Sequence, residues 1–205
     1  MKRRIFPFAV LTLALALLPG AAPADGEFKP WFSESGVTVE IARQASGPAW
    51  VRGTAELPVA AEKIAALLAD YANYAALFGP GLKSAVIIEQ KEPAARLHLV
   101  WHYPWPLKNR DGLVRYEMTK ADGGGYQLEW RGDARPGDPQ EGVRISRIEG
   151  RTRILPLGPA RSRVSYSYYG DLGGDFSAAA QEKAWRKEPV EYFAALRRAL
   201  KVKAE

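Results

Sequence analysis

The sequence contains no cysteine and only two histidines, His98 and His102. The lack of cysteine excludes disulfide bonds and attachment through a lipidated cysteine. Successive residues of a strand are about 3.3 Å apart, so two histidines four positions apart on one strand are separated by about 13 Å and do not share a metal ion. We therefore expect neither a metal site nor a cofactor, and a solvated or hydrogen-bonded role for both histidines.

Long hydrophobic runs are also scarce. The apolar run Ile5–Leu18 is 14 residues long, which is short of the roughly 20 residues that a spanning helix needs. Basic residues at positions 2–4 precede it, and Ala-Pro-Ala follows at 22–24. This pattern is typical of a secretory signal peptide, residues 1–24, cleaved after Ala24; a membrane anchor is the alternative. The expected location is the periplasm or the medium.

The charge of the remaining chain is low. The formal net charge is +6 for all 205 residues and +3 once residues 1–24 are removed. A mildly basic, exported chain is a poor candidate for binding nucleic acid. Residues 25–205 contain no repeat and no linker long enough to divide them, and their length suits a single domain. We expect that domain to be a monomer.

Hydrophobic periodicity predicts the order of the elements. Alternating residues predict strands at 37–42, 50–57, 82–90, 95–103, 112–120, 126–133, 143–155 and 162–170, with 28–35 as a packed lead-in. The 3.6-residue spacing predicts helices at about 60–70, 71–78 and 177–203. Six consecutive strands joined by tight turns indicate an antiparallel meander. The fold class is therefore α+β, with helices covering one face of a curved sheet.

The last helix, Ser177–Lys203, has one apolar face that must lie against the sheet. Pro189 lies inside it and predicts a kink, or a break between two helical pieces, which makes it a candidate hinge. The inner face of the sheet is rich in aromatic residues. These residues either form a solid core with the helix or line a cavity beneath it.

The segment Tyr103–Asp111 reads YPWPLKNRD. It resembles the PWP-x(2–3)-RD stretch of START-type lipid-transfer domains, and Leu67–Tyr71 and the closing helix with Pro189 agree with that family. The resemblance covers essentially all of residues 25–205. It implies a helix-grip fold, in which a curved antiparallel sheet wraps a long C-terminal helix and leaves a hydrophobic tunnel. It also implies an apolar ligand such as a lipid, although the wider superfamily includes polyketide aromatase/cyclases.

The resemblance and the strand pattern together define the candidate site. The residues expected to line the cavity are Trp101, Tyr103, Trp105, Val114, Tyr116, Met118, Trp130, Tyr166, Tyr168, Trp185, Tyr192, Phe193 and Leu196. We expect the aromatic and leucine side chains of the last helix to face Trp101, Tyr116, Trp130 and Tyr166 across that space. Arg110 and Asp111 either form ion pairs that secure the corner or meet the polar head of a ligand.

Five arginines lie on the last two predicted strands: positions 147, 151 and 153 share one face of the strand at 143–155, and positions 161 and 163 follow the next turn. They indicate a solvated outer face or, alternatively, transient docking on anionic head groups. Three functions remain open. The first is a non-enzymatic protein that binds a lipid for transfer or sensing in the cell envelope. The second is a cyclase or hydrolase on the same fold that uses Tyr103, His102 or Asp111, and the third is a module with a filled core. No clustered acid/base set supports the enzyme.

Overall fold

The computed structural model describes residues 23, 27–174, 176 and 178–204. The predicted signal peptide and its cleavage point lie outside these residues, except for Pro23. The described residues form one ten-stranded sheet in the order β1-β2-β3-β10-β9-β7-β6-β5-β4, with β8 paired to β6 in parallel and the other neighbours antiparallel. The strands are β1 (Lys29–Glu34), β2 (Val37–Ala42), β3 (Trp50–Leu57), β4 (Leu82–Lys91), β5 (Ala94–Trp101), β6 (Arg110–Ala121), β7 (Gly125–Gly132), β8 (Val143–Arg144), β9 (Arg147–Gly158) and β10 (Arg161–Asp171).

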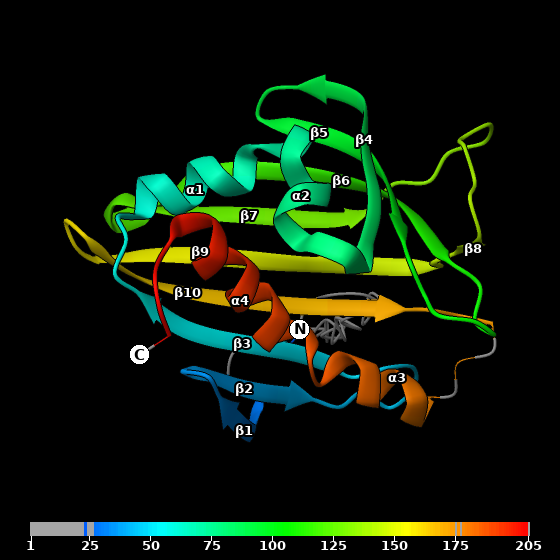
Figure 1. The fold of residues 1–205 in the computed structure, drawn as a ribbon, viewed down its shortest axis with the longest axis horizontal. Helices are drawn as coiled ribbons and strands as arrows, with labels where there is room; N and C mark the ends of the chain where they lie inside the picture. The colour runs from blue at the N-terminus through cyan, green and yellow to red at the C-terminus, as the bar shows by residue number, and fades with distance from the viewer. Residues whose placement is uncertain (1–22, 24–26, 175, 177, 205) are drawn as a thin grey trace, which may run out of the picture.

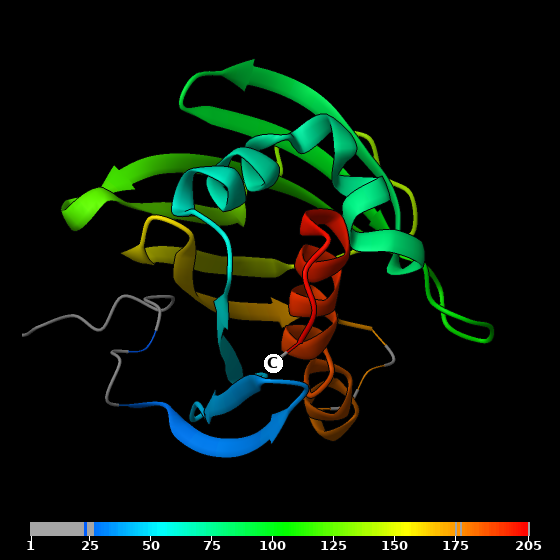
Figure 2. The ribbon, with the colours of Figure 1, turned by 60° about the vertical axis from the view of Figure 1, so that its left-hand side comes forward.

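Helices cover the concave face of this sheet. They are α1 (Ala61–Ala69), α2 (Tyr74–Phe78), α3 (Ala178–Trp185) and α4 (Glu188–Leu200), with short 3-10 turns at 71–73, 79–81 and 122–124. Figure 1 shows α1, α2 and α4 in front of the strands, and Figure 2 shows the sheet curving around α4. The predicted α+β class is therefore confirmed, and so is the curved antiparallel sheet around a C-terminal helix. No helix within the described residues is long and apolar enough to cross a membrane.

The helix predicted at 177–203 is two helices. A break between two helical pieces is confirmed, but it lies at 186–187, between α3 and α4, and not at Pro189 as predicted. Pro189 lies in the first turn of α4, where its missing N–H removes no internal hydrogen bond. It is buried against β3, since a Cβ atom added at Gly53 would lie 2.6 Å from the Cβ of Pro189. The break between the helices, rather than Pro189, is the candidate hinge.

Three strand predictions need correction. The lead-in at 28–35 contains a strand, β1, which pairs with β2 through a bulge. The strand predicted at 143–155 is divided into β8 and β9, because the Ile145 amide donates to the carbonyl of Asp111 and the chain turns there. The strand predicted at 95–103 ends at Trp101, since two prolines follow closely.

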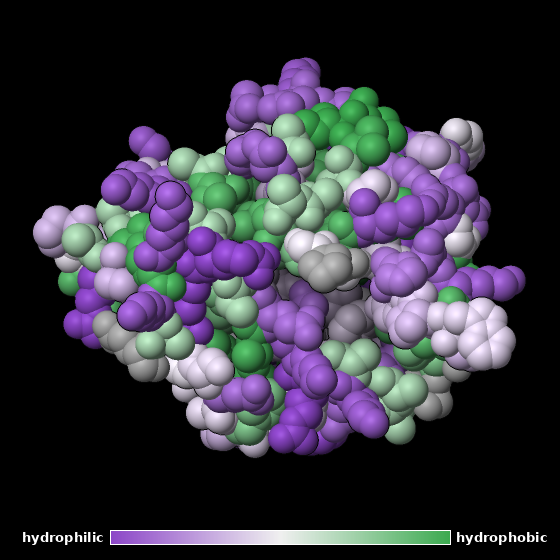
Figure 3. All heavy atoms as spheres, in the orientation of Figure 1, coloured by the Kyte–Doolittle hydropathy of each residue, from purple (hydrophilic) through white to green (hydrophobic). Residues whose placement is uncertain are grey.

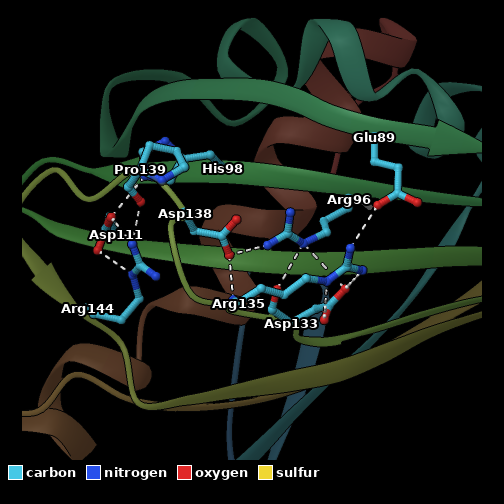
Figure 4. A network of polar contacts seen from close by, with 9 residues as sticks. All are labelled: Glu89, Arg96, His98, Asp111, Asp133, Arg135, Asp138, Pro139 and Arg144. Carbon is cyan, nitrogen blue, oxygen red and sulfur yellow. Dashed lines mark hydrogen bonds and ion pairs between the residues drawn. The ribbon is translucent and has the colours of Figure 1, made fainter.

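The core lies between the helices and the concave face. Leu97 and Leu99 of β5 point into it, as the alternation predicts, while His98 points to the convex face. His98 is nevertheless buried, because the segment between β7 and β9 covers that part of the sheet (Figure 4).

The edge strand β4 carries exposed apolar side chains. Val86 and Ile88 are 53% and 41% exposed, and Figure 3 shows apolar atoms gathered over that strand.

Candidate ligand cavity

A cavity of about 530 Å³ lies between the concave face of the sheet and α4. This volume is within the range of about 300–1,000 Å³ that is usual for small-molecule sites. The alternative prediction, a solid core beneath the last helix, is therefore wrong. Eight of the predicted residues line it: Trp101, Tyr103, Tyr116, Trp130, Tyr166, Tyr168, Trp185 and Tyr192. That these side chains contact a ligand stays a prediction.

Five predicted residues are not part of the lining. Trp105 is 92% exposed at the tip of the β5–β6 connection, beyond the sheet. Phe193 and Leu196 are fully buried on the side of α4 that packs toward β2 and β3, where a Cβ atom at Gly53 would lie 3.2 Å from the Phe193 ring. Val114 and Met118 of β6 pack within the hydrophobic core cluster instead.

The face of α4 that borders the cavity was not predicted from the sequence. This face carries Glu188, Glu191, Ala194, Ala195 and Arg198. The hydrophobic pattern of α4 pointed to the neighbouring apolar stripe as the inner face, because the cavity face combines charged and small residues. The available sequence signal for the cavity face was the recurrence of small residues among charged ones at helical spacing. The other lining residues missed are Leu68, Tyr74, Phe78, Gly81, Leu82, Leu99, Leu128, Ile145, Ile148, Thr152 and Leu172.

The aromatic wall is a continuous series of ring contacts. The Tyr192 ring stacks on Tyr166 with 3.9 Å between the ring centroids, and Tyr166 stacks on Trp130 at 5.5 Å. The hydroxyls of Tyr192 and Thr152 are 2.9 Å apart and hydrogen-bonded. The expectation that Tyr192 faces Tyr166 across an open space is therefore wrong, because the two rings are in contact. The cavity lies beside this contact.

Two glycines make room for the wall. A Cβ atom at Gly150 would lie 2.3 Å from the Trp130 ring, and one at Gly170 would lie 2.2 Å from the Tyr168 hydroxyl. The carbonyl of Gly170 also accepts a hydrogen bond of 3.1 Å from Nε1 of Trp185. Because any larger residue would displace these rings, the two glycines fix the shape of the cavity.

Glu188 is an acidic residue in this aromatic environment. It lies in the first turn of α4, and its Oε1 accepts a hydrogen bond of 2.8 Å from the Tyr166 hydroxyl. Burial raises the pKa of Glu188, the Tyr166 hydroxyl opposes this rise, and the Glu191 carboxylate adds to it. Burial and the Glu188 charge raise the pKa of Tyr103 to about 12. Tyr103 is therefore a weak acid and does not serve as a base near neutral pH.

Arg110 does not line the cavity. The prediction that it forms an ion pair with a strand partner is also wrong, because no acidic side chain among the described residues pairs with it. It is 1% exposed and donates to the carbonyls of Lys108, Leu172 and Gly173. Its guanidinium also lies over the Phe176 ring, 4.7 Å from the centroid. Arg110 thus connects the start of β6 to the connection between β10 and α3, at the end of the cavity.

Asp111 points to the opposite, convex face of the sheet, so its role as a head-group candidate is wrong. It is fully buried and accepts hydrogen bonds from Arg144 at 2.9 and 3.0 Å and from the Glu141 amide at 2.9 Å. His98 Nε2 lies 2.9 Å from the same carboxylate (Figure 4). Burial works to raise the pKa of Asp111, but these hydrogen bonds hold that pKa below its ordinary value. The ion-pair interpretation of Asp111 is confirmed.

Several charged residues of the convex face form ion pairs. Arg161 and Arg163 both contact Glu56, and Arg147 contacts Glu149. This arrangement agrees with a solvated outer face for the arginine series.

The structure does not bring together the three residues of the enzyme hypothesis, since Tyr103 lies in the cavity, His102 is exposed, and Asp111 lies on the convex face. No group of three potential metal ligands occurs within the described residues.

A curved antiparallel sheet that encloses a C-terminal helix, with an apolar cavity between them, defines a helix-grip protein of the START type. The family model described as polyketide cyclase / dehydrase and lipid transport matches residues 48–203. The chain therefore belongs to this family.

Solved structures share the fold at low sequence identity. A STAR-related lipid transfer protein from Xanthomonas axonopodis is 21% identical, with a TM-score of 0.74 over 85% of this chain and 99% of its own. Human StAR-related lipid transfer protein 5 is 14% identical, with a TM-score of 0.76 over 87% and 88%. The Zhui aromatase/cyclase from Streptomyces sp. R1128 is 16% identical, with a TM-score of 0.55 over 73% and 92%. No curated protein matches the sequence.

Proposed function

We propose that this protein binds one apolar ligand, a lipid, in the cavity and carries or senses it in the cell envelope without chemical turnover. The observation that carries the proposal is the cavity of about 530 Å³ between the sheet and α4. Burial of apolar ligand surface contributes about 2.5 kcal/mol for each 100 Å² removed from water. The basic, apolar start of the sequence supports export, and the lipid-transfer neighbours support a carrier.

Native mass spectrometry of the protein purified from its host tests this proposal. We expect a reproducible mass increment of one lipid for each chain, which organic extraction removes. An empty protein that also binds no lipid in competition assays contradicts the proposal. Conversion of the retained molecule into a product would instead favour a cyclase-like enzyme, the class of one structural neighbour.

Exchange of the ligand needs an opening, and we propose that α4 moves away from α2 about the break at 186–187. Arg198, which lines the cavity, donates a hydrogen bond of 2.9 Å from its guanidinium to the carbonyl of Leu77 at the end of α2. This contact holds the last turns of α4 against α2. It is a latch on one side of the cavity.

Replacement of the latch residue, Arg198→Met, is expected to accelerate ligand release about tenfold or more, because a hydrogen bond from a charged donor contributes about 1.5–3 kcal/mol to the closed state. Stopped-flow release of a fluorescent fatty acid measures the rate. Lys203→Met removes the same charge from an exposed position beyond α4 and serves as the control. Equal release rates for both variants and the unmodified protein would argue against the latch.

Membrane contact is the second part of the proposal. Trp105 is 92% exposed between two prolines, in the connection that begins at Tyr103 of the cavity wall. Exposed tryptophan favours the membrane interface, because its apolar ring contacts lipid there while its N–H remains hydrogen-bonded to water. We propose that this loop touches the lipid surface during transfer.

The substitution Trp105→Ala is therefore expected to reduce vesicle binding about tenfold and to leave the thermal unfolding midpoint unchanged, since the side chain has few contacts. Co-sedimentation with vesicles of anionic and zwitterionic lipid measures binding. Leu157→Ala changes another exposed apolar residue, on β9, and serves as the control. Full vesicle binding by Trp105→Ala would exclude this loop as the contact.

A further inference from the structure

The cavity has an uneven distribution of charge. Three charged side chains line it within the described residues: Glu188, Glu191 and Arg198. Glu188 is ten residues before Arg198 in α4, so the two are about 15 Å apart along the helix axis. Glu191 is exposed, whereas Glu188 is partly buried. One end of the cavity thus presents a carboxylate, and the lining residues described there include no basic side chain. The nearby guanidinium of Arg110 lies behind this wall, 5.7 Å from the centroid of the Tyr103 ring, and donates to three backbone carbonyls.

The groups around Glu188 strengthen its negative potential. The Tyr166 hydroxyl donates to Oε1, and no other described residue donates to this carboxylate, so the second oxygen is available to a ligand. The Glu188 charge also helps to raise the pKa of Tyr168 and of Tyr192, after burial, which places both phenols close to it. Aromatic faces are themselves electron-rich and attract cations. The electrostatics of this end therefore favour a cation.

We propose that this end of the cavity receives an ammonium head group carried on an apolar body, with Glu188 as its counter-ion and the surrounding tyrosine rings as cation–π partners. The inference rests on the proposed function, because it requires that the cavity hold an apolar ligand. At about 30 Å³ for each non-hydrogen group, the cavity holds about 18 such groups. A single-chain amine or a compact polycyclic amine fits this size. A carboxylate or phosphate head would be repelled.

An amine fits better than an alcohol because of the cost of a buried charge. A carboxylate that is removed from water without a counter-charge is strongly destabilised. An ammonium ion supplies that counter-charge, whereas a hydroxyl supplies only a hydrogen bond. With the cavity empty, the raised pKa of Glu188 means that its proton is retained to a higher pH than usual. Binding of a cation then displaces that proton.

This exchange makes the affinity for an amine depend on pH. The groups facing Glu188 are Glu191 and Tyr192 of α4, Tyr166 and Tyr168 of β10, Tyr116 of β6, and Tyr103 of the β5–β6 connection. The tyrosines remain neutral below about pH 9. The affinity for an amine is therefore expected to rise with pH as Glu188 ionises, until the amine itself loses its proton near pH 10.

Titration calorimetry of the delipidated protein with dodecylamine, 1-dodecanol and dodecanoate tests the inference, with each compound kept below its solubility limit or critical micelle concentration. The unmodified protein is expected to bind dodecylamine about tenfold more tightly than dodecanol at pH 8, and dodecanoate least tightly. Glu188→Gln, which retains an acceptor for Tyr166, should abolish the preference for the amine. Glu62→Gln removes an exposed acid from the first turn of α1 and should retain it.

The outcomes separate the inference from the proposed function. If the unmodified protein binds all three compounds equally, the head-group inference is wrong and the apolar cavity function stands. If it binds none of them, both are wrong. Should Glu188→Gln fail to fold, the pH profile of the unmodified protein decides. Amine affinity that rises as the pH is raised above the ordinary glutamate pKa of about 4.3, with flat dodecanol affinity, supports the inference, and two flat profiles overturn it.

Discussion

Substitution of Asp111 by alanine is expected to lower the free energy of unfolding by about 3–5 kcal/mol, because it leaves the Arg144 guanidinium without its carboxylate in a mostly buried position. The change also removes the acceptor of the Glu141 amide and the partner of His98. The segment between β7 and β9 then loses its attachment to the sheet. Chemical denaturation followed by tryptophan fluorescence measures the effect.

The control for Asp111 is Glu117→Ala on the same face of β6. Glu117 lies 3.6 Å from Arg115 and both side chains are partly exposed, so its loss should cost less than about 1 kcal/mol. Because the pKa of Asp111 is lowered in the folded protein, the free energy of unfolding measured as a function of pH provides a second test. The carboxylate stabilises the fold above its unfolded pKa, and this contribution disappears as the pH falls through its lower folded pKa. Asp111→Ala should therefore flatten the loss of stability below about pH 4.

Substitution of Ala194 by tryptophan is expected to weaken binding of an apolar ligand at least about 100-fold. Ala194 lines the cavity from α4 and is exposed, so the helix accommodates a larger side chain while the indole occupies the space of the ligand. A tryptophan side chain covers about 150–250 Å², which corresponds to several kcal/mol of lost ligand burial. Displacement of a fluorescent fatty acid measures the affinity.

Ala199→Trp provides the matched control, because Ala199 is exposed on α4 and does not belong to the lining. It makes the same chemical change in the same helix. Thermal unfolding of both variants should remain within a few degrees of the unmodified protein, since neither position is part of the core. Equal ligand affinity for the two variants would show that the cavity is not the binding site.

Sequence periodicity was sufficient for the architecture because each strand has one buried face. The alternation at Leu97 and Leu99 and the helical spacing of Ile64 and Leu68 correspond to fully or nearly fully buried side chains. Periodicity failed where tertiary contacts override it. For Asp111 periodicity left an ion pair and a ligand contact open, and the β7–β9 segment decides for the ion pair, because it covers that face and supplies Arg144 as the partner.

The cavity face of α4 was unpredictable for a different reason. A hydrophobic pattern identifies the side of a helix that excludes water through close packing, and in α4 this side contains Phe193 and Leu196. A side chain that borders a void does not need to be apolar, so Glu188 and Ala194 gave no signal in that pattern. The aromatic wall was identified more completely, since Trp130 and Tyr166 belong to strands whose alternation was clear and Tyr192 belongs to the apolar stripe of the last helix.

The sheet is open, and its edge at β4 carries the exposed side chains of Val86 and Ile88. A flat apolar edge of this kind is a template for association with another strand. The pairing of β4 with β5, however, shifts register between Leu82 and Ser84 and again between Ile87 and Glu89. Such irregularities twist a strand and interrupt the row of backbone groups that a second chain would need. The two shifts thus protect an open sheet from edge-to-edge aggregation without closing it into a barrel.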